Sequence, residues 1–267
     1  MAGIFEMIDL VWRPPRGKPM VKRPRVNRHL PENFKYYGNW GFTIYRTYYG
    51  PESNEHWDML LDALKRQTNL AFGYYEDKDY ADEVKRQKGR GVASHLGFYE
   101  NQDEYRDDLK RLKKLFRLDT REDPSLLGGL DIRQLREVCL NEQPETERTM
   151  AGRLFRFVLV ADEAVLKDIA KGEFVVKTVG YDWEERGEYW GWMRIPTGYL
   201  LQLWHSLILW RFTPYRFLRF DGPEEDLEEY IWPGDFVADP TGDCSEVRRG
   251  DHYSAQSPLF KIERNKE

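Results

Sequence analysis

The sequence predicts an α+β protein of two ferredoxin-like halves, pseudo-duplicated, each a split βαβ unit with an antiparallel sheet and helices on one face. Residues 153–221 show hydrophobic patterns in the order strand, helix, strand, strand, helix, strand. Residues 36–118 show the same order without a clear final strand. The 267-residue chain is 40% hydrophobic and 15% aromatic, which is enough apolar material for a sizeable core although 33% of its residues are charged.

In the first half, residues 40–49 predict a buried strand because they are aromatic and β-branched and end at Gly50-Pro51. Ser53 is expected to cap the next helix, whose apolar residues from Trp57 to Leu64 recur at helical spacing. The remaining predicted elements are strands at 70–75 and 92–99 and a helix at 102–117.

Residues 119–152 are rich in turn-forming pairs and predict a connector with one short helix at 131–139. In the second half, Asp162 and Thr197 are the expected N-caps of two helices. The strands predicted there are 154–161, 174–181, 189–195 and 215–220. Residues 1–35 are expected to form an extended basic arm, and residues 222–267 an acidic extension.

Positive charge is concentrated near the N-terminus. Between residues 13 and 29 there are seven cations and no acid, which leaves 34 cations against 46 acids in the rest of the chain. The seven are Arg13, Arg16, Lys18, Lys22, Arg23, Arg25 and Arg28. Such an arm can bind the phosphates of tRNA or another RNA, or it can lie on the acidic body of its own protein or of a second copy.

Three segments carry a resemblance to known sequences. They are W-G-F-T-I-Y-R-T at 40–47, F-x-F-V-L-V-A-D-E-A-V-L at 155–166 and G-W-M-R at 191–194. Together they resemble a large group of uncharacterised proteins of filamentous fungi, over most of residues 36–220. The resemblance implies a fungal, intracellular origin and transfers no catalytic residues.

The acidic run at 225–229 is similar to the D-D-x-x-E signature of the fungal arginine-containing cyclodipeptide synthases, which use aminoacyl-tRNA; the first position here is Glu. The similarity implies a catalytic role for Asp226 and Glu229. The alternative is a solvated acidic turn after Gly222-Pro223, because acids are favoured at the start of a helix.

Rings gather in the second half, where six of the nine tryptophans lie between Trp183 and Trp232. Residues 189–195 partly resemble the RNP1 strand of RNA-recognition domains, which implies base stacking on Trp190 and Trp192. In a protein of two packed halves, the same face would instead line a ligand cleft between them. The residues predicted to bind a ligand there are Tyr45, Trp190, Trp192 and Arg194.

Other classes of site have little support in the sequence. Asp235, Asp239 and Asp243 offer oxygen ligands, but their spacing fits no calcium loop and favours a turn, so we expect no metal and no cofactor. With two cysteines far apart and no apolar run long enough for a bilayer, we expect no disulfide and no membrane span, and a cytoplasmic location.

These observations predict a fungal α+β protein that binds a small ligand or a protein partner in an aromatic cleft. The alternatives are a tRNA-dependent enzyme of specialised metabolism, such as an arginine-containing cyclodipeptide synthase, and an RNA-binding module.

Overall fold

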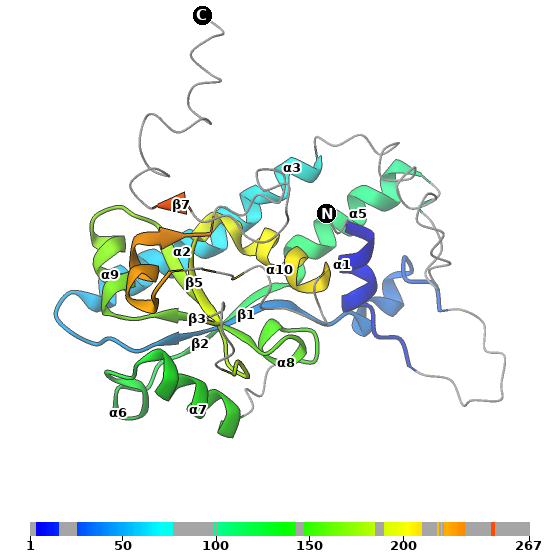
Figure 1. Ribbon diagram of the computed structural model, residues 1–267. Helices are drawn as coiled ribbons and strands as arrows, with labels where there is room; N and C mark the ends of the chain where they lie inside the picture. The colour runs from blue at the N-terminus through cyan, green and yellow to red at the C-terminus, as the bar shows by residue number, and fades with distance from the viewer. Residues whose placement is uncertain are drawn as a thin grey trace, which may run out of the picture.

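A five-stranded mixed sheet, with strand order β2-β1-β3-β4-β5, organises the computed structural model (Figure 1). The structure describes residues 4–15, 26–76, 99, 101–142, 147–184, 190–209, 218, 220, 222–232 and 247–248. The strands are β1 (Trp40–Arg46), β2 (Phe116–Arg121), β3 (Phe157–Ala161), β4 (Val175–Gly180) and β5 (Trp192–Pro196), with a separate pair, β6 (Tyr230–Ile231) and β7 (Val247–Arg248).

Helices pack on both faces of this sheet. They are α1 (Ile4–Val11), α2 (Ser53–Ala71), α3 (Gly73–Glu76), α5 (Gln102–Leu115), α6 (Pro124–Leu127), α7 (Ile132–Glu142), α8 (Ala151–Leu154), α9 (Glu163–Ala170) and α10 (Leu200–Leu209). The 3₁₀ helices whose bounds are described are η1 (Pro31–Tyr36), η2 (Thr197–Tyr199) and η4 (Glu224–Glu229). Figure 1 shows α2 and α10 on one side of the sheet and α6, α7 and α8 on the other.

The strand directions bring several strand ends together. β1 is parallel to β2 and to β3, while β4 is antiparallel to both β3 and β5. Strands β1, β2, β3 and β5 therefore all end at one edge of the sheet, which we call the carboxyl edge. In open sheets, ligands bind beyond the carboxyl ends of parallel strands, where successive connections leave to opposite faces.

The α+β class is confirmed, but the division into two ferredoxin-like halves is not. The described strands β1 to β5 form one continuous sheet. A split βαβ unit needs the two strands around its helix to be parallel and separated by a third strand. Instead β3 and β4, which flank α9, pair directly and antiparallel, with Val158 opposite Val179. Hydrophobic patterns locate strands, but they do not choose the partner of each strand.

The first half also differs in its elements. The strand predicted at 70–75 is wrong: these residues are the end of α2, a turn at Phe72 and the start of α3, and this arrangement buries Phe72 and Tyr75 in the core. The helix predicted at 102–117 ends at Leu115 and is followed by β2, whose partly charged residues gave no strand signal. The predicted strands 92–99 and 215–220 lie outside the described residues except at Tyr99, Leu218 and Phe220.

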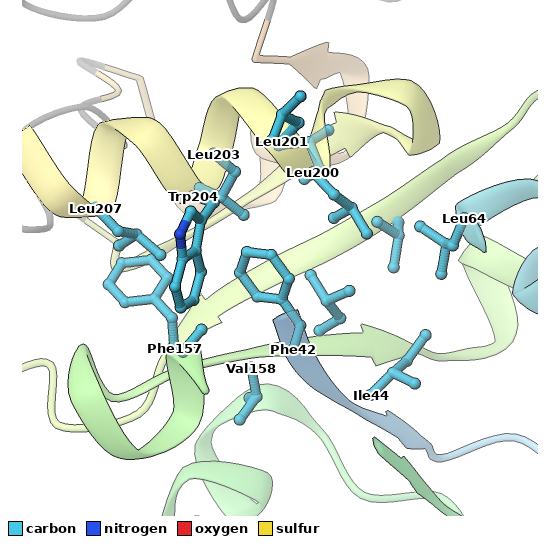
Figure 2. Close-up of a cluster of buried hydrophobic side chains, with 14 of the residues drawn as sticks. Phe42, Ile44, Leu64, Phe157, Val158, Leu200, Leu201, Leu203, Trp204 and Leu207 are labelled. Carbon is cyan, nitrogen blue, oxygen red and sulfur yellow. The ribbon is translucent and has the colours of Figure 1, made fainter. Parts of the chain in front are cut away.

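The core joins rings from distant parts of the chain. Trp204 of α10 lies with its ring centroid 5.5 Å from that of Trp40 and 5.9 Å from that of Phe42. Figure 2 shows Trp204 and Leu207 pointing from α10 toward Phe42 and Phe157 of the sheet. Helix α1, at the start of the segment predicted as an extended arm, is itself buried in this core.

Candidate functional site

Two buried cations lie opposite each other at the carboxyl edge. Lys177 of β4 is paired in register with Arg194 of β5, so both side chains project from the same face of the sheet. Lys177 is 3% exposed and Arg194 is 1% exposed. A charge removed from water to this extent is stable only with close ionic or hydrogen-bonding partners.

Arg194 is bound by two carboxylates from different elements. Its Nη1 donates to Oδ2 of Asp168, on α9. Its Nε and Nη2 both donate to Oε2 of Glu228, on η4, with Nε at 2.8 Å. The guanidinium therefore presents one side of its fork to the helix and the other to Glu228.

Lys177 shares the Glu228 carboxylate with Arg194. Its Nζ donates to Oε1 of Glu228 and, at 2.5 Å, to Oδ2 of Asp162, the N-cap of α9. The same Nζ lies 4.8 Å from the ring centroid of Trp192, within range of a cation–π interaction. We call Lys177, Trp192 and Arg194 the carboxylate cradle, because the two cations hold one carboxylate between them beside an aromatic ring.

Residues 222–232, which we call the acidic strap, cover the tryptophans of this edge. Trp192 is 3% exposed and donates its Nε1–H to Glu224 at 3.0 Å. Trp190 is half-buried and donates its Nε1–H to the Gly222 carbonyl at 3.0 Å. The backbone N–H of Trp232 donates to the Arg194 carbonyl at 2.8 Å. Three of the four residues predicted to bind a ligand therefore lie together, beneath the strap.

Tyr45, the fourth, lies apart from the other three. It is on β1, with β3 between it and Lys177 of β4. Its side chain is buried beside Cys139 of α7, and this burial raises the pKa of the Tyr45 phenol. Burial also raises the pKa of the Cys139 thiol to about 12. Tyr45 is thus part of the core under α7.

The two carboxylates predicted as catalytic, Asp226 and Glu229, are exposed on η4. The residues of η4 that face the protein are Glu224, Leu227 and Glu228, and Leu227 is fully buried. Sequence reasoning missed Glu224 and Glu228 as binding partners. The signal that could have found them is the apolar Leu227 within an otherwise acidic run, since a buried residue orients its neighbours one turn away.

Of the seven cations predicted in the basic arm, Arg13 and Arg28 are described, and they differ in environment. Arg13 is exposed at the end of α1. Arg28 is 4% exposed, with its Nη2 3.0 Å from Oδ2 of Asp108 on α5. Arg28 is therefore bound to the acidic body of its own chain, one of the two arrangements expected for the arm. The other predicted cations, Arg16, Lys18, Lys22, Arg23 and Arg25, lie outside the described residues.

The structure adds little on metals and membranes. Asp235, Asp239 and Asp243 lie outside the described residues, and within the part of the chain that is described no group of His, Cys, Asp and Glu side chains could hold a metal ion. Among the described helices, none has the length and apolar character needed to cross a bilayer.

Comparisons of the chain with family models, with curated proteins and with solved structures find no match.

Proposed function

We propose that this chain is a binding protein that takes a carboxylate-bearing ligand in the carboxylate cradle. The observation that carries the proposal is the convergence of Arg194 and Lys177, both buried, on the single carboxylate of Glu228. A guanidinium fork supplemented by an ammonium group is well matched to the two oxygens of a carboxylate. In this proposal the Glu228 side chain has the place of the ligand's carboxylate.

The position of the cradle in the sheet supports the same function. Arg194 lies near the end of β5, and Lys177 binds Asp162 directly after the end of β3. Asp162 thus lies at the carboxyl end of a parallel strand, the position at which open sheets bind ligands. The sequence predicted a binding site in a cleft between two halves, and we now propose it at the edge of a single sheet. The proposed site keeps Trp190, Trp192 and Arg194 and adds Lys177.

Binding is proposed ahead of the two alternatives. Asp226 and Glu229 are exposed on a short 3₁₀ helix, which gives little support to a tRNA-dependent synthase acting through them. Trp192 is buried, which gives little support to base stacking on its ring.

We also propose a reducing, cytoplasmic setting, because Cys139 is a free buried thiol. The sequence resemblance supports a fungal source.

Chemical rescue tests the cradle. The Glu228→Ala variant leaves Arg194 and Lys177 facing a vacated carboxylate position, so we expect its thermal midpoint to fall below that of the unsubstituted protein. Added acetate or succinate is expected to raise the midpoint of this variant by a few degrees more than chloride at equal ionic strength, because only the carboxylates bind the folded state there.

The matched control is Glu229→Ala, which removes an exposed carboxylate from the same 3₁₀ helix. Acetate and chloride should affect this control and the unsubstituted protein alike. Equal responses of Glu228→Ala to acetate and to chloride would contradict the proposed function. Where Glu228→Ala does not fold by itself, its refolding is compared in acetate and in chloride, and acetate alone is expected to restore the folded state.

A further inference from the structure

Within the acidic strap, the η4 turn binds the cradle region through two carboxylates, and one apolar residue of the turn is buried. Glu224 accepts from Trp192 at 3.0 Å and from Arg133 of α7 at 2.6 Å. Glu228 accepts from Arg194 and Lys177, and Leu227 is fully buried between the two glutamates in sequence. The residues of the turn that are bound or buried therefore have the spacing Glu-x-x-Leu-Glu.

The η4 turn is held in place mainly by this surface. It has six residues, of which five are acids, and a 3₁₀ helix of this length has weak internal hydrogen bonding. Neighbouring carboxylates repel one another, and three of the five are exposed. A hydrogen bond holds the strap on each side of the turn. One joins the Trp190 side chain to the Gly222 carbonyl, and the other joins the Trp232 backbone N–H to the Arg194 carbonyl. It can therefore leave the cradle while both of its ends remain attached.

We propose that the ligand of the cradle is an acidic peptide segment of a partner protein with the spacing Glu-x-x-Leu-Glu. In the absence of the partner, the η4 turn binds the cradle in its place, and the partner segment displaces this turn. This inference rests on the proposed function, because it needs the cradle to accept a carboxylate from outside the chain. The partner segment supplies one carboxylate to Arg194 and Lys177 and a second to Trp192 and Arg133.

Tethering sets the strength of the competition. The strap is part of the same chain, so it rebinds at a high effective concentration, and a free peptide competes with it at a disadvantage. Replacing Glu224 and Glu228 by glutamine weakens the binding of the strap to the cradle and so reduces this competition. The side chains of the cradle itself are unchanged. The inference thus predicts measurable peptide binding to the unsubstituted chain and tighter binding after two strap carboxylates are lost, whereas a strap that never leaves the cradle predicts no binding to the unsubstituted chain.

The test uses the full chain and a labelled synthetic peptide with the sequence of residues 222–232, measured by fluorescence anisotropy. We expect the Glu224→Gln/Glu228→Gln variant to bind this peptide at least tenfold more tightly than the unsubstituted chain, with affinity falling as salt is added. The matched control, Asp226→Asn/Glu229→Gln, changes the net charge equally at exposed positions and should bind like the unsubstituted chain. Circular dichroism confirms that both variants are folded; if the first is not, Glu228→Gln alone is used.

Specific outcomes overturn the inference. Equal binding by the two double variants, or equal binding of a peptide with Gln in place of the first and last glutamates of the pattern, would show that the contact is only nonspecific charge attraction. A dimer that forms by light scattering and dissociates on adding peptide would identify a second copy of this chain as the occupant, and would overturn the assignment to a different protein. If acetate rescues Glu228→Ala but no variant binds peptide, this inference fails and the proposed function stands; if neither occurs, both fail.

Discussion

Cys139 of α7 lies in a buried group with two phenols. Its thiol is fully buried near Tyr45 and Tyr181, and the Tyr181 hydroxyl donates to the Gly152 carbonyl. Burial raises the pKa of the thiol from 9.0 to about 12 and that of the Tyr181 phenol from 10.0 to about 12. Because the charged forms are disfavoured in the folded state, these groups make the protein sensitive to alkali.

The sign of this dependence follows from linkage. Below pH 9 the Cys139 thiol is protonated in both the folded and unfolded states, and it does not change stability with pH. Between pH 9 and about 12 only the unfolded chain releases this proton, so the free energy of unfolding falls by about 1.4 kcal/mol per pH unit from this group. We expect urea unfolding at pH 8, 9 and 10 to show that the free energy of unfolding falls less steeply with pH in Cys139→Ala than in the unsubstituted protein. Parallel pH profiles would contradict this assignment, and Cys244→Ser serves as the cysteine control.

At the residue scale, the sequence identified some of the residues that make up the proposed site. It singled out Trp190, Trp192 and Arg194, because a ring-rich strand with a cation is visible in the pattern. It did not identify Lys177 as their neighbour, since that depends on the register between β4 and β5. Asp226 and Glu229 were named from the similarity to the D-D-x-x-E signature, and Glu224 and Glu228 were not considered, because an acidic run does not reveal which of its members turn inward until the surface that they pack against is known.

Among the elements, β1 depends on a glycine for its pairing with β2. Gly41 has a φ of 137°, and a Cβ placed on it would lie 1.9 Å from the Arg117 carbonyl oxygen. A side chain there would force β1 and β2 apart, and an L-residue would also be strained at this φ.

We therefore expect Gly41→Ala to lower the free energy of unfolding by about 3 kcal/mol or more, measured by urea denaturation. Gly73→Ala, at the start of α3, is the control, because nothing lies within 4 Å of the point that its Cβ would occupy and alanine favours a helix. A loss in Gly41→Ala no larger than that in Gly73→Ala would contradict the role of Gly41.

Elements with strong local signals were predicted well. Helix α9 begins after its predicted cap, Asp162, whose Oδ1 accepts from the Val165 N–H at 3.0 Å. The other two expected N-caps differ from the prediction. Thr197 is the first residue of the 3₁₀ helix η2. Ser53 is the first residue of α2, and its hydroxyl donates to the Gly50 carbonyl at 2.6 Å. Strand β2 was missed because a strand at the sheet edge with one partner needs little apolar patterning.

For the whole molecule, the single sheet changes the expected unfolding behaviour. Two ferredoxin-like halves would each have a core and could unfold separately. In the described structure, β1 from the first half pairs with β3 from the second, and Trp204 packs on Trp40 and Phe42. The packing of the two halves into one core favours a single cooperative transition.

We expect thermal unfolding followed by circular dichroism and by tryptophan fluorescence to give coincident midpoints. The Leu64→Ala variant, which truncates a fully buried side chain of α2, should lower both midpoints equally, with a loss of about 2–5 kcal/mol. Two separated transitions, or a shift in only one probe, would indicate independently folding halves.

The burial of α1 has a consequence for synthesis of the chain. Met7 contacts His205 across 198 residues of sequence, and α1 packs on α10. At about 5–20 residues per second, a ribosome takes roughly 10–40 s to progress from the first of these residues to the second. The part of the apolar face of α1 that packs on α10 lacks this neighbour throughout that interval, whereas α5, which also packs on α1, is translated earlier. We therefore expect the face of α1 to be buried in two steps during synthesis, first against α5 and later against α10.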